Sequence, residues 1–161
     1  MFTNKLKLLL CALSLIGIGA CSTTDSTPAG TVTGNTMSAK IDGANWNSTI
    51  TVSTSEDGDV VIGGTDNTIG ISIGLSDART TGVYQIGPIS AENMASITES
   101  TTKLWMAGAT FGSGTITFTK LTSTDAEGTF TISAVPSPTH PSTTGTKTVT
   151  EGKFAVKFTK K

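Results

Sequence analysis

The chain has 161 residues, which suits one ordinary domain with a single hydrophobic core. Only 14% of the residues are charged and the formal net charge is −1, so the chain lacks the basic surface that nucleic-acid binding requires. The single histidine excludes most histidine-based catalysis and metal binding. Thr (32), Gly (18) and Ser (17) are abundant instead. This composition favours strands and turns over long helices.

Residues 1–20 have the pattern of a cleaved secretory signal peptide. A short basic region precedes an apolar run over residues 8–18, which is too short to span a bilayer comfortably. Residues 18–21, Ile-Gly-Ala-Cys, resemble a bacterial lipobox. The resemblance implies attachment of a lipid to the Cys21 thiol and cleavage just before that residue. The alternative is an ordinary signal peptide followed by an incidental cysteine.

The chain after Cys21 contains no other cysteine, so it has neither a disulfide nor a thiolate metal site. Two or three acyl chains on Cys21 would anchor the protein stably in a membrane. Residues 22–36 are mostly Ser, Thr, Gly, Pro and Asn and lack the apolar surface needed to fold. We therefore expect a signal peptide over 1–20, the lipidated cysteine and a flexible linker over 21–36, and one β-domain over 37–161.

From residue 37 onward, apolar and polar residues alternate, with turn residues about every ten positions. The clearest strands are expected at 69–75, 116–119, 130–133 and 154–158, and weaker ones at 37–42, 48–54, 59–64, 82–87, 93–98 and 103–110. Asp57-Gly58 and Asp66-Asn67 have the composition of hairpin turns. About ten short strands predict an all-β fold, an antiparallel meander that forms a sandwich or a closed barrel.

Two other segments have a weaker pattern. Residues 90–95 could form a single turn of helix. Residues 136–146 are rich in Pro and Thr, and we expect a mobile loop there, although long loops are also where functional residues concentrate.

Trp46 and Trp105 are the candidate ligand-binding residues. An exposed tryptophan on a β-domain is a common platform for stacking a sugar ring, whereas a buried one belongs to the core. Trp105 lies between Leu104 and Met106, so one face of its strand must carry large apolar side chains outward. Core packing is the favoured interpretation of both tryptophans.

The motifs for catalysis and metal binding are incomplete. Residues 100–103 have the Ser-x-x-Lys spacing of penicillin-interacting enzymes, but they lead into a strand and lack the companion motifs. His140 has no second histidine or cysteine with which to bind zinc. Residues 56–59 hold three carboxylates without a calcium-binding loop, and a charged hairpin tip explains them as well. The sequence therefore predicts no catalytic residue, no metal and no cofactor.

Five segments, read in order, resemble a known family. They are Met37–Trp46 (MSAKIDGANW), Gly82–Tyr84 (GVY), Gly114–Phe118 (GTITF), Gly128–Ile132 (GTFTI) and Val149–Phe154 (VTEGKF). Their order and spacing are similar to a domain-of-unknown-function family of small Bacteroidetes lipoproteins, over about 37–158. The resemblance implies a lipid-anchored, all-β module of the cell envelope and no particular activity.

Membership of such a family raises the question of sorting. Surface-exposed Bacteroidetes lipoproteins usually carry an acidic run after the lipidated cysteine, but residues 22–25 contain one acid. A periplasm-facing position at the outer membrane is therefore favoured over the cell surface. Asp25-Ser26-Thr27 resembles the acceptor used in Bacteroidetes O-glycosylation, which makes Ser26 a candidate glycosylation site.

These observations lead to three hypotheses about function. The first is a non-catalytic envelope lipoprotein that binds a partner protein or a glycan and is attached to the membrane through Cys21. The second is a small-ligand carrier with a cavity inside the barrel. The third is a hydrolase acting on glycans through two carboxylates that meet only in the folded chain.

Overall fold

The computed structural model describes residues 34–159, which form eleven strands in one sheet. Their bounds are β1 Thr36–Ile41, β2 Ala44–Asn47, β3 Ile50–Glu56, β4 Asp59–Thr65, β5 Ile69–Leu75, β6 Gly82–Ile86, β7 Met94–Glu99, β8 Lys103–Ala107, β9 Ser113–Leu121, β10 Asp125–Pro136 and β11 Lys147–Lys157. The expected signal peptide, Cys21, Ser26 and nearly all of the expected linker lie outside the described residues. Residues 34–159 contain no helix that is long and apolar enough to cross a membrane.

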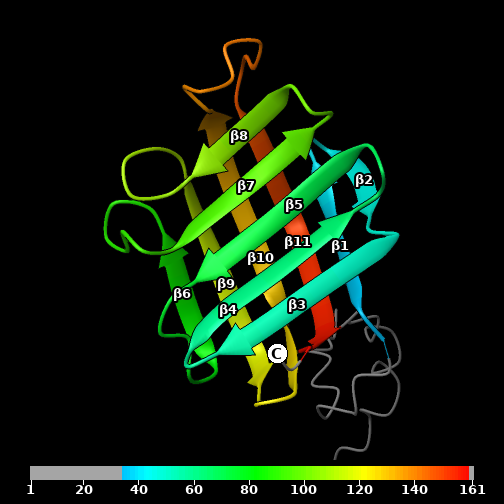
Figure 1. Cartoon of the computed structure of the whole chain (residues 1–161), viewed down its shortest axis with the longest axis vertical. Coiled ribbons are helices and arrows are strands. Elements are labelled where there is room, and N and C mark those ends of the chain that lie inside the picture. Colours follow the sequence, from blue (N-terminus) through cyan, green and yellow to red (C-terminus); the bar gives the residue numbers. More distant parts are fainter. Residues whose placement is uncertain (1–33, 160–161) are drawn as a thin grey trace, which may run out of the picture.

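Nine strands form a strongly curled half-barrel in the order β2-β1-β11-β10-β8-β7-β5-β4-β3, and all their pairings are antiparallel. The curl produces two layers (Figure 1). The front layer contains β3, β4, β5, β7 and β8, and the back layer contains β2, β1, β11, β10, β9 and β6. Strand β10 joins them, because residues 126–133 pair with β9 and residues 135–136 pair with β8.

The all-β prediction is confirmed, and the sheet lies between a sandwich and a closed barrel. Only part of the sheet is a simple meander. Strands β3, β4 and β5 pair in chain order, but β1 pairs with β11 and β5 pairs with β7. Asp57-Gly58 forms the expected hairpin turn, with positive φ at both residues. Strand β2 was not expected, and residues 90–93 form turns rather than a helix.

Apolar side chains from both layers fill the space between them. The largest of those that are completely buried are Phe118, Phe130, Met37, Ile62, Ile71, Ile73, Ile97, Ile116 and Ile132. The alternation of strand residues places one face of every strand in this core. The interior is therefore occupied by protein, and all three grooves that we describe below lie on the outside of the back layer.

Two phenylalanines of the core depend on glycines of the neighbouring strand. Phe154 lies opposite Gly128, and Phe130 lies opposite Gly152, in the pairing of β10 with β11. A Cβ on Gly128 would come within 2.6 Å of the Phe154 ring, and one on Gly152 would come within 2.6 Å of the Phe130 ring. The bare glycine backbone thus makes room for each ring, an arrangement known as aromatic rescue of a strand glycine.

The segment 137–146, where we expect a mobile loop, packs along β8 in the structure. The Ser137 amide donates a hydrogen bond to the Leu104 carbonyl at 2.8 Å. The Leu104 amide in turn donates to Thr143 Oγ1 at 3.0 Å. Ser142 Oγ donates to the Thr102 carbonyl at 2.8 Å. Through these bonds the loop continues the line of β10 beside β8.

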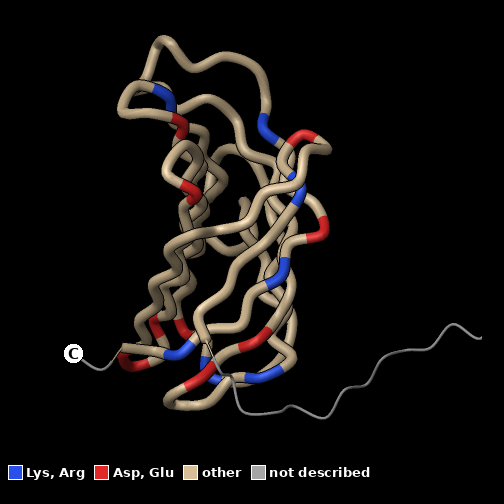
Figure 2. The backbone as a smooth tube through the Cα atoms, turned by 90° about the vertical axis from the view of Figure 1, so that its right-hand side faces the viewer, with Lys and Arg blue, Asp and Glu red and all other residues tan. Residues whose placement is uncertain are grey.

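Charged side chains are unevenly distributed between the layers. Seen edge-on in Figure 2, the back layer carries Lys and Glu along its length, whereas the front layer carries charges near the ends of its strands. The charged residues of the front-layer strands lie at strand ends (Glu56, Asp59, Glu99 and Lys103), so the middle of this layer exposes only uncharged side chains. This difference in charge separates the two outer faces of the domain.

Candidate functional site

Both candidate tryptophans lie in the core. Trp46 and Trp105 are each 4% exposed. The Trp46 indole donates to the Ile69 carbonyl at 3.3 Å, and the Trp105 indole donates to the Gly145 carbonyl at 3.1 Å. Neither ring presents a face to solvent on which a sugar could stack, so the core interpretation fits both residues.

The other motifs noted in the sequence also occupy structural positions. Ser100 begins the turn between β7 and β8, and the Lys103 ammonium lies 3.2 Å from Glu99 Oε1. His140 Nδ1 lies 3.0 Å from Thr139 Oγ1, within the loop along β8. No group of three or more metal-ligating side chains that could hold an ion exists among residues 34–159.

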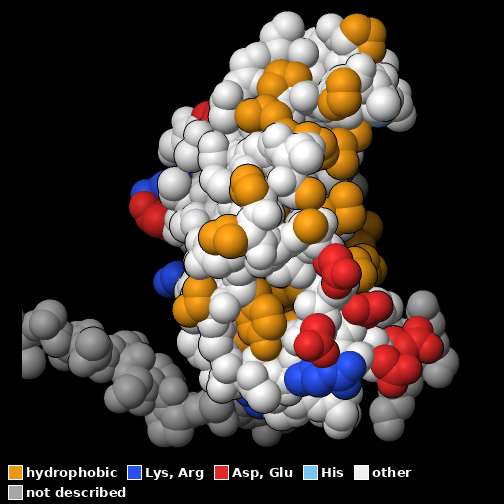
Figure 3. Space-filling view, turned by 90° about the vertical axis from the view of Figure 1, so that its left-hand side faces the viewer, with side chains coloured by type: hydrophobic (Ala, Val, Ile, Leu, Met, Phe, Trp, Pro, Cys, Tyr) orange, Lys and Arg blue, Asp and Glu red, His pale blue; other side chains and the backbone are white. Residues whose placement is uncertain are grey.

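The acidic residues 56–59 form the tip of the β3–β4 hairpin. Arg79 lies over this tip: its Nη2 donates to the Asp57 carbonyl, and its Nε pairs with Asp77. Figure 3 shows a group of acidic side chains beside a basic one at the lower right of this view. The charged hairpin tip is thus tied to the β5–β6 connection by Arg79, which is the structural alternative to a calcium site.

The outer side of the back layer forms a surface rich in hydroxyl and amide groups, which we call the polar face. It consists of outward side chains from five strands: Asn45 and Asn47 of β2, Ser38 and Lys40 of β1, Glu151 and Lys153 of β11, Thr129 and Thr131 of β10, and Thr115 and Thr117 of β9. The strand register places these side chains in rows, such as Asn47, Ser38, Lys153, Thr129 and Thr117.

A β-bulge at Glu151 interrupts this face. Ser38 pairs with Lys153 whereas Lys40 pairs with Thr150, so β11 has an extra residue relative to β1. The register with β10 shifts at the same place. Glu151 has a φ of 53° and pairs with Lys40 at 2.7 Å. A bulge changes the direction in which its side chains point. A non-glycine residue with left-handed backbone angles is strained, and such strained residues are common at functional sites.

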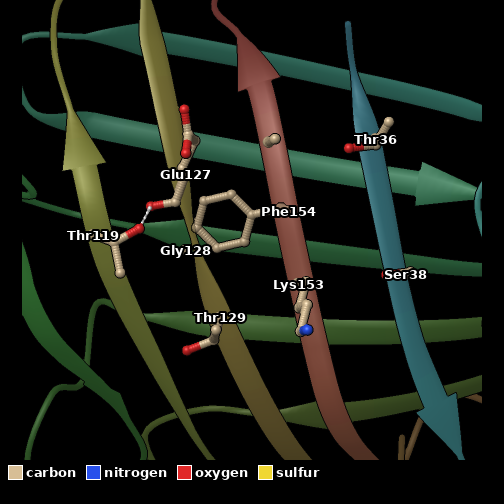
Figure 4. Close-up of a pocket in the computed structure, with 9 residues that line it drawn as sticks. Thr36, Ser38, Thr119, Glu127, Gly128, Thr129, Lys153 and Phe154 are labelled. Atoms are coloured by element: carbon tan, nitrogen blue, oxygen red, sulfur yellow. Dashed lines mark hydrogen bonds between the residues drawn. The ribbon is translucent and has the colours of Figure 1, made fainter. Parts of the chain in front are cut away.

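Three shallow grooves adjoin on the polar face, and Lys153 lines all of them. The first, of about 390 Å³, runs between Thr36 and Ser38 on one side and Thr119, Glu127 and Thr129 on the other (Figure 4). The second is lined by Lys40, Asn45, Asn47 and Glu151, among others. The third is lined by the threonines of β9 and β10 and again by Glu151. Lys153 therefore stands where the grooves meet.

Several polar groups of this face are free to bind a ligand. The side chains of Asn45, Asn47 and Lys153 make no hydrogen bond or ion pair with any other residue in the described part of the chain. Glu151 is instead held by Lys40, and Glu127 lies 3.7 Å from the Lys120 ammonium. The face thus combines fixed ion pairs with free amides and one free ammonium, the groups that bind hydroxyls and anions.

The shifted pKa values of Glu99 and Lys147 belong to another part of the molecule. Hydrogen bonds from Lys103 and then Lys147 lower the pKa of Glu99. Burial alone would lower the pKa of Lys147, but hydrogen bonds to Glu99 and Asp42 outweigh it and raise the pKa. The Lys147 ammonium also lies 4.9 Å from the centre of the Trp105 ring. Lys103, Glu99, Lys147 and Asp42 thus form a network of ion pairs at one end of the core.

Sequence reasoning did not identify the polar face. It depends on the pairing of β1 with β11, which joins residues more than a hundred positions apart. One local signal was present: the inward residues of β11 are Val149, Gly152, Phe154 and Val156, with an interval of three at its first step. In a regular strand every second residue points inward, so a spacing of three residues between two inward residues indicates a bulge.

The match to a family model covers residues 33–156, which include nearly all the described strands. The chain belongs to the family named Domain of unknown function (DUF6252). No curated protein and no solved structure shows a significant match to it. Membership confirms a domain-of-unknown-function family over the region expected, and this family's name carries no activity, ligand or partner.

Proposed function

We propose that this protein is a lipid-anchored, non-catalytic component of a bacterial cell envelope whose β-domain binds a glycan through the polar face. The observation that carries the proposal is the convergence of three open grooves on free polar groups at a strained bulge. Asparagine amides donate and accept hydrogen bonds at once, as sugar hydroxyls do. A glycan would therefore be held by hydrogen bonds along the face rather than by aromatic stacking.

The anchoring part of the proposal rests on the lipobox at residues 18–21. Lipid on Cys21 and a linker over 22–36 would hold the domain at the outer membrane, with the periplasmic side favoured. A Cys21→Ala variant is expected to move from the membrane fraction to the soluble fraction. Protease added to intact cells should spare the domain, and digestion before lysis would place it on the cell surface instead.

The two alternatives to binding at the polar face receive less support. A carrier needs an internal cavity, but the described interior is filled by the core side chains. A glycan hydrolase needs two carboxyl groups that face the same glycosidic bond. Glu127 and Glu151 line different grooves, and each is paired with a lysine. Binding without catalysis is thus the function that the face supports best.

The test is a glycan array probed with the detergent-purified, lipidated protein. Wild type should bind a defined subset of glycans, and the Asn45→Ala/Asn47→Ala variant should bind them at least about tenfold more weakly, because two free amides are lost. The matched control is Ser72→Ala/Ser96→Ala on the front layer, which should bind as wild type does. A blank array, or equal loss in both double variants, would contradict the proposal.

A further inference from the structure

We infer that the glycan is anionic, carrying carboxylate or sulfate groups, and that Lys153 is the residue that recognises them. This inference rests on the proposed function, because it assigns the chemical class of the ligand to the same face. It starts from the position of Lys153, which lines all three grooves. A ligand lying in any one of them would pass the ammonium group.

Lys153 is the free cation among the lysines that line the grooves. Lys40, which lines the second groove, is paired with Glu151 at 2.7 Å. Lys153 itself is exposed, and it makes no ion pair within residues 34–159. An ammonium group left unpaired among hydroxyls and amides can take up an anion without breaking an existing bond.

The carboxylates near Lys153 do not cancel this charge. Glu151 and Glu127 are the acidic side chains that line the grooves. Glu151 is neutralised by Lys40, and Glu127 lies within ion-pair distance of Lys120. The charged side chains that line the grooves are thus two lysines and two glutamates, and Lys153 is the lysine among them that no carboxylate of the described residues holds. The strongly acidic hairpin tip, residues 56–59, belongs to the front layer.

The row through Lys153 fits an extended polymer. It runs Asn47, Ser38, Lys153, Thr129 and Thr117 across five neighbouring strands. At the usual spacing of adjacent strands the row is about 19 Å long, with Lys153 in its centre. Hydroxyl and amide groups on both sides would bind neutral parts of a chain while Lys153 binds one of its charged groups. A chain with repeated anionic groups would meet this requirement in several registers.

The experiment compares three polymers by affinity electrophoresis of the detergent-purified, lipidated protein: polygalacturonate, dextran sulfate and neutral dextran. Polygalacturonate or dextran sulfate should retard wild type, and dextran should not. Lys153→Ala should weaken retardation about fivefold at low ionic strength, and Lys153→Glu should abolish it. Lys153→Arg should retain it. Lys157→Ala is the matched control, because it removes an exposed lysine of the same strand that lines none of the grooves.

The outcomes separate this inference from the proposed function. Retardation by polygalacturonate alone assigns carboxylates, and retardation by dextran sulfate alone assigns sulfates. Equal loss in Lys153→Ala and Lys157→Ala would overturn the role of Lys153 and indicate a diffuse charge effect. If the glycan array shows binding but only to neutral glycans, and Lys153→Ala binds them normally, the ligand is not anionic and the proposed function stands. If no polymer retards the protein and the array shows no binding, both the proposed function and this inference are wrong.

Discussion

The two outer faces of this domain are made from the same kinds of residue but differ in what they expose. The middle of the front face carries Gly63, Ser72, Gly74 and Ser96 on adjacent strands, and no charged side chain lies among them. The polar face on the back layer carries threonines, asparagines and ion pairs. The difference arises from which side of each strand the glycines occupy.

Gly63, Gly70 and Gly74 of the front layer point outward while Gly64 points into the core, and Gly114, Gly128 and Gly152 of the back layer point inward. Gly63 and Gly74 have no side chains and therefore leave shallow gaps in the outer surface of the front layer. Their neighbours on the adjacent strands are the exposed residues Val52 (62%), Val61 (44%) and Met94 (48%). Gly128 and Gly152 instead lie under phenylalanine rings in the core. The back layer therefore keeps its outward positions for larger polar side chains, and a high glycine content produces two chemically distinct surfaces.

The largest expected effect tests the distinction between inward and outward positions within one strand. Trp105→Ala should lower the free energy of unfolding by about 3–5 kcal/mol, because a buried indole is removed from the core. Met106→Ala, its neighbour on the outer side of β8, should cost less than about 1 kcal/mol. Both values come from denaturant titration of the purified protein. A similar loss of stability in the two variants would show that Trp105 does not point into the core while Met106 points outward.

The second prediction concerns the glycines. Gly152→Ala should cost about 3 kcal/mol, because its Cβ would meet the Phe130 carbonyl oxygen at 2.5 Å and the ring at 2.6 Å. Gly74→Ala should be neutral or gain about 0.5 kcal/mol, because the nearest atom lies 3.6 Å away and the unfolded chain loses freedom. Thermal unfolding of the two variants measures these changes in stability. The contrast between the layers fails if Gly152→Ala is tolerated.

The third prediction concerns the bulge on the polar face. Glu151→Gly should be about 1 kcal/mol more stable than Glu151→Ala, because both lose the exposed ion pair with Lys40 but only alanine keeps the strained φ of 53°. Chemical unfolding of both variants measures this difference. Both should also bind glycan more weakly than wild type. Equal stabilities would mean that the bulge is not strained.

The smallest effect concerns the ion pairs that connect the two layers at one end of the core. Because the folded pKa of Glu99 is lowered, its contribution is present at neutral pH and is lost as the pH falls through that pKa. Glu99→Gln should therefore cost about 0.5 kcal/mol at pH 7, and this cost should disappear once the pH has fallen through the lowered pKa of Glu99. Glu92→Gln, an exposed acid outside the cluster, is the control. A cost for Glu99→Gln that does not change with pH would contradict this explanation.

The sequence predicted most of the fold because local alternation determines where strands form. Residues 69–75 were expected as a strand and match β5. Strand β2 was missed because it has four residues and a single inward apolar side chain, Trp46. The Asp42-Gly43 turn before it, with positive φ at both residues, is the same signal that identified Asp57-Gly58.

The candidate site could not be predicted in the same way. Its grooves lie across β2, β1, β11, β10 and β9, which come from both ends of the domain. Alternation indicates which residues point outward, but it does not indicate which strands become neighbours. Glu151 appeared only as part of a family-like segment, because the bulge that exposes it is defined by its partners on β1 and β10.

The most direct test of the polar face is an NMR titration of the uniformly ¹⁵N-labelled, detergent-purified protein with the oligosaccharide that binds best on the array. We expect amide shift changes at Asn45, Asn47, Glu151 and Lys153 on the back layer. No change is expected at Ser72 on the front layer. Shift changes confined to the front layer, with the back layer unaffected, would contradict the assignment of the binding surface.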